Sequence, residues 1–191
     1  KDKPIRAFHP WIFSGAIDLL DDNFKTGDLA KVYSNDESFL GIGYLNPHSQ
    51  IAVRMLTFED EEINTAFFAR RMEEAKKLRE GFLPSKTNAY RLIYSEGDFL
   101  PGLIIDQYGD YLVAQFLTAG MDVLKPTILE AIKMVFPSKG IYERGDSEMR
   151  RLEGLTEALS VLGGEEPPDY VEIEEYGNRF LVDIKHGQKT G

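Results

Sequence analysis

Short apolar runs separated by turn residues fill the first 58 positions of the chain. Apolar side chains gather over residues 29–33 and 39–45, and two glycines interrupt the second run. Over residues 51–56 the pattern alternates, which sets Arg54 on the opposite face of the predicted strand from its apolar neighbours. Glycines within a strand are typical of a bulge or of a bend in a barrel. The first segment therefore predicts a small, mostly β structure.

The pattern changes after position 58. Apolar residues recur at helical spacing over 68–82, after an acidic run at 59–62, and again over 124–135. A less regular stretch at 149–162 predicts a helix broken near Gly154. Strand patterns lie at 90–94, 103–105, 111–117, 141–143, 171–175 and 180–184.

This order of elements predicts an α+β protein with two units. Residues 1–58 are expected to form a small β-barrel, and residues 59–184 a central α+β domain. Residues 185–191 end in Gly-Gln-Lys-Thr-Gly, which follows a strand and begins a glycine-rich turn. We therefore expect 185–191 to be the first residues of a further domain that continues past Gly191.

Composition narrows the class of protein. The chain has 191 residues and no cysteine, so it contains no disulfide, thiolate metal site or cysteine nucleophile. Apolar runs are too short for a membrane helix, and we expect a cytoplasmic protein that binds neither membrane nor DNA. The net charge of -10, from 22 basic and 32 acidic residues, argues against nonspecific coating of nucleic acid. This net charge does not exclude a local recognition surface on an otherwise acidic protein.

No complete catalytic site is visible in the sequence. Gly-x-Ser-x-Gly, Walker and His-Glu-x-x-His motifs are all missing, and the three histidines have no ligand spacing. We expect no metal site and no catalytic residue within this chain.

Two stretches of the first segment are candidates for binding. His9 and Trp11 precede Ser14 in one turn-rich stretch, and the only tryptophan of the chain serves either as a core residue or as a stacking face for RNA. Arg54 follows a turn, and it is either a solvated strand residue or a phosphate contact. The full set of candidate RNA-binding residues is His9, Trp11, Ser14, Asn46, Ser49 and Arg54.

Another candidate stretch surrounds a predicted tight turn at Pro101-Gly102. Glu96, Asp98 and Asp106 lie close to this turn in the sequence. The three carboxylates are either ordinary loop residues or a polar cluster that brackets a base edge or positions an arginine. A hydrolase built on Glu96 and Asp98 is a weak alternative, since neither has a histidine partner in view.

Five ordered motifs resemble one known family, the ribosomal RNA cytosine-5 methyltransferases that begin with a PUA domain. The resemblance spans nearly the whole chain. The motifs are HPWIFSGAI at 9–17, GIGYLNPHSQIAVRML at 41–56, YRLIYSEGDFLPGLIIDQYGD at 90–110, IYERGDSEMRRLEGL at 141–155 and VEIEEYGNRFLVDIKHGQKTG at 171–191.

The resemblance implies three parts in a complete protein. A PUA barrel binds ribosomal RNA, a central domain with an EEHEE order of elements follows, and a Rossmann-like domain binds S-adenosylmethionine and performs the reaction. It also implies that the catalytic cysteine lies in that third part, consistent with the lack of cysteine here. Cytosine C5 is a poor nucleophile until a thiolate adds at C6, so this chain would not catalyse methylation alone.

The resemblance also implies roles for individual residues. The candidate RNA-binding set would form or support the PUA face. Gln188, Lys189 and Thr190 would lie at the edge of the cofactor site, although the chain alone would not bind the cofactor tightly. The cleft shared with the catalytic domain would be lined by Glu96, Asp98, Asp106, Glu143 and Arg144.

Two interpretations of the whole chain remain open. It is either the RNA-recognition and substrate-positioning portion of a methyltransferase for 23S-type ribosomal RNA, or a stand-alone PUA-type RNA-binding adaptor without catalysis. Resemblance to dimeric family members makes a homodimer a candidate assembly.

Overall fold

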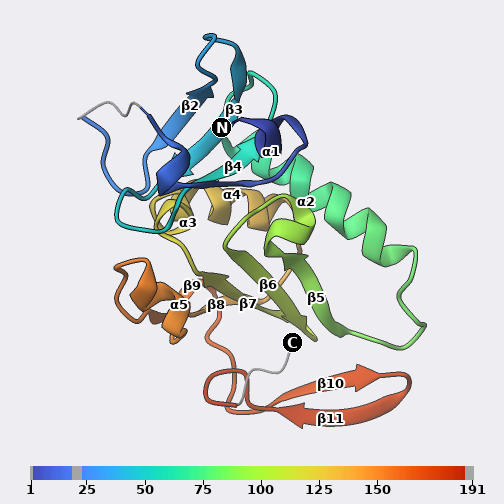
Figure 1. Ribbon diagram of the computed structural model, residues 1–191. Coiled ribbons are helices and arrows are strands. Elements are labelled where there is room, and N and C mark those ends of the chain that lie inside the picture. Colours follow the sequence, from blue (N-terminus) through green and yellow to red (C-terminus); the bar gives the residue numbers. More distant parts are fainter. Residues whose placement is uncertain (1, 19–22, 188–191) are drawn as a thin grey trace.

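The N-terminal unit, residues 2–58, is built on one antiparallel sheet. The computed structural model describes residues 2–18 and 23–187 of the chain (Figure 1). The strand order is β1-β4-β3-β2. The elements of this unit are α1 (Lys3–Arg6), β1 (Trp11–Phe13), η1 (Ser14–Ala16), β2 (Leu29–Tyr33), β3 (Phe39–Leu45) and β4 (Ile51–Thr57).

Strand β3 shows the irregularity that its glycines predict. Its register with β4 shifts between Ile42 and Gly43. A Cβ atom on Gly43 would lie 2.4 Å from the carbonyl oxygen of Arg54, so only glycine allows the two strands to approach this closely. The predicted bulge is confirmed. No ladder joins β1 to β2 within the described residues, and closure into a barrel stays a prediction.

The central unit, residues 59–187, contains a five-stranded sheet. Its order is β5-β6-β7-β8-β9, with only the β7–β8 pair parallel. Two helices, α3 and α4, form the crossover that a parallel pair requires. The strands are β5 (Ala89–Tyr94), β6 (Leu103–Tyr108), β7 (Tyr111–Phe116), β8 (Gly140–Arg144) and β9 (Leu159–Gly164). The helical segments are α2 (Thr65–Glu80), η2 (Ser95–Asp98), α3 (Ala119–Val123), α4 (Lys125–Val135) and α5 (Glu148–Leu152).

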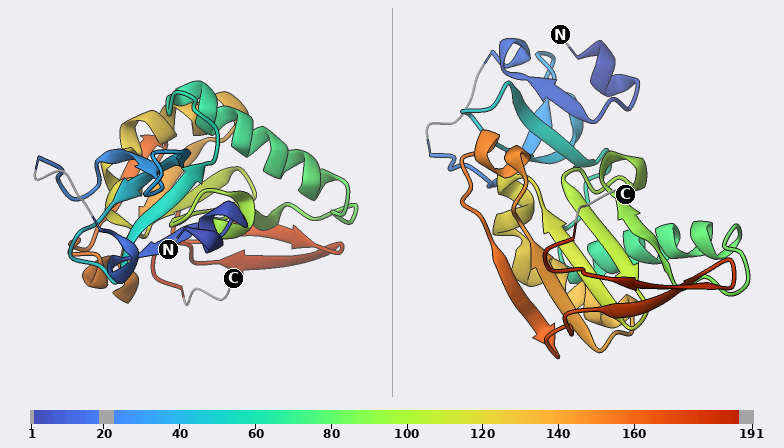
Figure 2. Two further views of the ribbon diagram at one scale, coloured as in Figure 1. Left: turned by 45° about the horizontal axis from the view of Figure 1, so that its top comes forward. Right: turned by 90° about the horizontal axis from the view of Figure 1, so that it is seen from below.

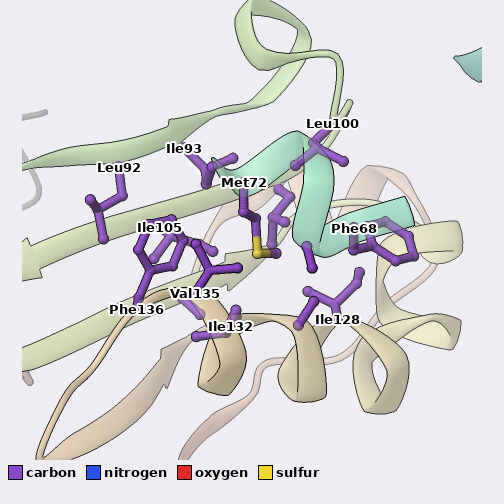
Figure 3. Close-up of a cluster of buried hydrophobic side chains, with 14 of the residues drawn as sticks. Phe68, Met72, Leu92, Ile93, Leu100, Ile105, Ile128, Ile132, Val135 and Phe136 are labelled. Atoms are coloured by element: carbon purple, nitrogen blue, oxygen red, sulfur yellow. The ribbon is translucent and has the colours of Figure 1, made fainter. Parts of the chain in front are cut away.

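The main hydrophobic core lies between this sheet and helices α2 and α4, which cover the same face (Figures 1 and 3). Alternation along β7 explains the layering. Leu112, Ala114 and Phe116 point into the main core, whereas Val113 points to the other face. There it packs against the hairpin formed by β10 (Val171–Glu175) and β11 (Asn178–Val182), which lies across the sheet (Figure 2).

Most predicted elements are present, with one correction. The broken helix predicted over 149–162 is wrong in its second half, because α5 ends at Leu152 and residues 159–164 form β9 against β8. The acidic run at 59–62 precedes helix α2, whose N-cap Asn64 accepts a hydrogen bond from the Phe67 amide. The EEHEE order stays unconfirmed, since three strands precede the crossover helices.

A search of the described helices finds none with the length and apolar character needed to cross a membrane.

Candidate functional site

Glu153 gathers the polar side chains at the contact between the two units. It follows α5 in the central unit, and its carboxylate accepts hydrogen bonds from Asn46 Nδ2 at 2.9 Å and Ser49 Oγ at 3.3 Å. It also pairs with Arg54 Nη2 at 2.8 Å. The backbone amide of Ala119 donates to the same carboxylate at 3.4 Å. Three predicted RNA-binding residues therefore meet at one glutamate.

Burial assigns Asn46 and Arg54 to a structural contact, and Ser49 is half-buried beside them. The side chains of Arg54 and Glu153 are 5% and 3% exposed. Strand β4 is covered on both faces, one by its own unit and the other by the central unit, so Arg54 is not the solvated strand residue that alternation allows. Because its guanidinium is ion-paired and enclosed, the structure gives no open path from it to a phosphate. An RNA-binding role for Asn46, Ser49 and Arg54 stays a prediction that this geometry does not favour.

Tyr44 extends the same contact into the hydrophobic core. Its ring belongs to the main core of the central unit, and its hydroxyl donates to the Pro101 carbonyl at 2.8 Å. It also lies 2.9 Å from the Thr118 hydroxyl. Burial raises the pKa of Tyr44, so the phenol remains neutral and keeps its hydrogen bonds. A Cβ atom on Gly120 would lie 2.0 Å from the Tyr44 ring, so helix α3 approaches the N-terminal unit through a glycine.

Trp11 links the units at a second point. Its Nε1 donates to Glu96 Oε1 at 3.0 Å, and Ser95 Oγ donates to the other oxygen of Glu96. His9 and Ser14 are exposed on either side, and His9 Nδ1 accepts from the Trp11 amide at 3.2 Å. His9 and Ser14 thus remain accessible as candidate RNA contacts, whereas Trp11 also holds the two units together.

Replacing Trp11 by phenylalanine is expected to lower the free energy of unfolding by about 1–2 kcal/mol, because the smaller phenyl ring keeps part of the packing but cannot donate the indole's hydrogen bond to the carboxylate. Urea denaturation followed by circular dichroism measures the change. Glu96→Gln is the matched variant, since a neutral amide oxygen still accepts from the indole. A Trp11→Phe protein as stable as the parent would show that this contact contributes nothing.

The predicted cleft carboxylates do not meet in one network. Asp98 and Asp106 each pair with a different arginine, whereas Glu96 accepts from the Trp11 indole. Asp98 Oδ1 and Oδ2 accept from Arg79 at 2.9 and 2.6 Å, and the Tyr94 amide also donates to Asp98. Asp106 accepts two hydrogen bonds from Arg91, the shorter at 2.8 Å. These are paired carboxylates with no adjacent histidine, and their role in a substrate cleft stays a prediction.

Glu143 belongs to a buried charge cluster under the crossover. Lys125 Nζ lies 2.9 Å from Glu143 and 2.9 Å from Asp122. Arg150 Nη1 lies 2.9 Å from Asp122 and 3.7 Å from Glu143. Two cations therefore face two carboxylates, and the cluster holds α3, α4, α5 and β8 together.

The charges of this cluster make the free energy of unfolding depend on pH in the acidic range. Burial opposes ionisation of Asp122, but hydrogen bonds from Lys125 and Arg150 prevail and lower its pKa below 3.8. Its contribution is present above the unfolded-state pKa of about 3.9 and is lost as the pH falls through the lower folded-state value. We expect Asp122→Asn to flatten the loss of stability as the pH falls below about 4, as measured by urea denaturation at several pH values. If the variant loses stability with falling pH as steeply as the parent does, this assignment is contradicted.

Arg144 holds the segment that leads to the end of the described chain. It donates to the carbonyls of Ile184 and Gly187 at 3.4 and 2.7 Å and to Asp146 at 2.9 Å. Its role is therefore to position this segment beside β8. The predicted cofactor contacts Gln188, Lys189 and Thr190 lie outside the described residues.

Sequence reasoning missed Glu153, Tyr44, Arg79 and Arg150. Glu153 looks like an ordinary surface residue in the sequence, because its partners are about a hundred positions away and no local pattern marks them. Among the described residues no group of three or more histidine or acidic side chains is arranged to hold a metal.

Residues 1–58, which include the N-terminal unit, match the family of PUA-like domains. Among solved structures, a Streptococcus mutans protein described as a SAM-dependent methyltransferase superposes with a TM-score of 0.80 at 26% identity, over 97% of this chain and 47% of that one. A second methyltransferase structure, complexed with SAH, has a TM-score of 0.80 at 24% identity and covers 98% of this chain, which shows a shared fold.

Curated relatives match the whole chain. It is 45% identical over 192 residues to ribosomal RNA large subunit methyltransferase I of Vibrio cholerae and 43% identical over 193 residues to that of Aliivibrio fischeri. Both matches cover 100% of this chain, but only 48% and 49% of the relatives. The chain is thus similar along its full length to about half of a ribosomal RNA methyltransferase.

Proposed function

We propose that this chain is the RNA-recognition and substrate-positioning portion of an S-adenosylmethionine-dependent methyltransferase that acts on large-subunit ribosomal RNA. The observation that carries the proposal is the 43–45% identity, sustained over all of this chain, to proteins named for that activity. The match of residues 1–58 to PUA-like domains supports an RNA-binding role for the N-terminal unit.

The contact between the units supports substrate positioning. Glu153, Tyr44 and Trp11 each cross from one unit to the other, through a buried ion pair or a hydrogen bond. RNA held on the N-terminal unit would therefore lie at a set distance from the central unit. Such an arrangement directs a bound substrate toward one place, as catalysis elsewhere in a longer protein requires.

We further propose that the methylated atom is cytosine C5. Activation of C5 needs a thiolate, and this chain has no cysteine, so the nucleophile would belong to the other half of the protein. S-adenosylmethionine would supply the methyl group there. The residues of this chain bind and orient RNA and perform no step of methyl transfer.

The acidic net charge is compatible with this proposal if recognition is local. His9 and Ser14 are exposed beside Trp11 and are the accessible candidate contacts in the N-terminal unit. Recognition of single-stranded bases by shape and stacking needs less positive charge than coating a duplex. The proposed partners are ribosomal RNA and a second copy of the protein.

An experiment on the natural protein tests the proposal. The protein is isolated from its source with an antibody against this chain, its intact mass is measured, and it is incubated with large-subunit RNA and S-adenosylmethionine labelled in the methyl group. We expect a mass roughly 20 kDa above that of this chain and label in 5-methylcytosine. A mass close to 21.7 kDa without methyl transfer would favour the stand-alone adaptor. Label in another nucleotide would contradict the choice of cytosine C5.

A further inference from the structure

An open groove lies between the end of helix α2 and the segment β5–η2. Its volume is about 350 Å³, near the lower end of the range for ligand pockets. Its lining combines large apolar or aromatic side chains with two guanidinium groups. The lining includes Arg79, Phe82, Arg91, Tyr94, Gly97 and Asp98.

Aromatic rings in and beside this groove face solvent. Phe82 is 83% exposed and Tyr94 is 56% exposed. Phe99, on the same loop as η2, is 55% exposed and has a left-handed backbone with φ of 56°. A non-glycine residue in that conformation costs free energy, and such strain occurs most often at functional sites. The fold therefore maintains an exposed ring at a costly position.

Arginines accompany these rings. The guanidinium of Arg91 lies 5.3 Å from the centre of the Tyr94 ring, and that of Arg71 lies 5.4 Å from the centre of the Phe99 ring. Asp106 holds Arg91 in place through two hydrogen bonds. The buried Nε of Arg71 has no hydrogen-bond acceptor within the described part of the chain.

Gly97 keeps the Tyr94 ring accessible. A Cβ atom at position 97 would lie 3.2 Å from Cδ1 of Tyr94, so any side chain there would cover part of the ring. The backbone of Gly97 is not in the left-handed region, and a turn does not require glycine here. Access to the ring is a further reason for glycine at this position.

We propose that this groove is a stacking site for unpaired bases of single-stranded RNA, which extends RNA recognition from the N-terminal unit onto the central unit. The inference rests on the proposed function. Exposed aromatic rings accompanied by arginines bind bases through stacking and cation–π contacts. A duplex hides its base faces, so the site selects unpaired RNA.

Continuity with the N-terminal unit favours RNA over a protein partner. Trp11 donates to Glu96 within η2, so the groove and the exposed residues His9 and Ser14 flank the same short segment. One strand of RNA would therefore contact both surfaces.

Fluorescence anisotropy with a labelled single-stranded RNA of about ten nucleotides tests the site in the full 191-residue chain. We expect Tyr94→Ala to weaken binding at least about fivefold, the lower end of what stacking one base contributes. Tyr94→Phe should bind like the parent, since the ring is kept. The slope of affinity against salt should stay the same, because no phosphate contact is removed. Tyr170→Ala, which removes an equally exposed tyrosine beside the hairpin, is the matched control.

Three outcomes would overturn the inference, and they differ in what else they affect. If Tyr94→Ala binds as tightly as Tyr170→Ala, the groove does not stack bases, and a protein segment becomes its better occupant while the proposed function stands. If an RNA duplex of equal length binds as well as the single strand, selection of unpaired bases is wrong. If the parent chain binds no RNA at all, including fragments of large-subunit RNA, the proposed function fails together with the inference.

Discussion

Replacing Glu153 by alanine is expected to lower the free energy of unfolding by about 3–5 kcal/mol, the range for breaking a buried ion pair from one side. The substitution leaves the Arg54 guanidinium enclosed without its carboxylate, and it removes the acceptor of Asn46 and Ser49. Chemical denaturation of the purified chain measures the loss. The large effect follows because the charge left behind is 5% exposed and water cannot solvate it.

Glu157 provides the matched control for this prediction. It lies four positions along the chain and pairs with Arg151, but both side chains are more than half exposed. Glu157→Ala should therefore change stability by about 0–1 kcal/mol. Replacing both Arg54 and Glu153 by methionine should recover part of the loss, because no unpaired charge remains. Equal effects of Glu153→Ala and Glu157→Ala would contradict the assignment of Glu153 to the contact between the units.

The second large effect is expected for Asp98→Ala, also about 3–5 kcal/mol. Asp98 accepts two hydrogen bonds from Arg79 and one from the Tyr94 amide, and its side chain is 5% exposed. Its removal leaves the Arg79 guanidinium, which is 18% exposed, without its carboxylate and the Tyr94 amide without its acceptor. Loss of this pair also loosens η2, the segment beside the proposed stacking groove.

A surface aspartate calibrates the measurement on Asp98. Asp110 pairs with Lys139 at 2.6 Å, but both side chains are about 60% exposed. Asp110→Ala is therefore expected to cost about 0–1 kcal/mol. A cost for Asp98→Ala no larger than this would show that the bidentate pair contributes little. The same contacts disfavour a hydrolase built on Asp98, because both carboxylate oxygens are already engaged by cations and amides.

Local patterns predicted much of the fold. Helical spacing identifies α2 and α4, because each helix buries one face against the main core. Short apolar runs bounded by turn residues identify β2, β3, β4 and β7, although β4 and β7 are covered on both faces. Strand β9 was misassigned because its side chains are mostly exposed, so neither period of burial marks it in the sequence. Its strand conformation comes from pairing with β8, a tertiary contact that no local pattern reveals.

The candidate site shows even more clearly that local sequence patterns do not reveal tertiary contacts. Trp11 is the only tryptophan, and Arg54 and Asp98 lie near predicted turns, so the sequence marks all three as candidates. Each does make a specific polar contact. Their partners lie between 19 and 99 positions away, so the sequence alone does not distinguish a binding residue from a buried ion pair. That distinction depends on burial, which tertiary structure decides.

Direct binding of large-subunit ribosomal RNA to the purified chain tests the central claim most directly. Filter binding with labelled fragments of that RNA should give saturable binding in about the micromolar range or tighter, with affinity that falls as salt rises. An excess of duplex DNA should compete poorly, because recognition relies on unpaired bases. Absence of saturable binding, or equal competition by duplex DNA, would contradict the claim that this chain recognises ribosomal RNA.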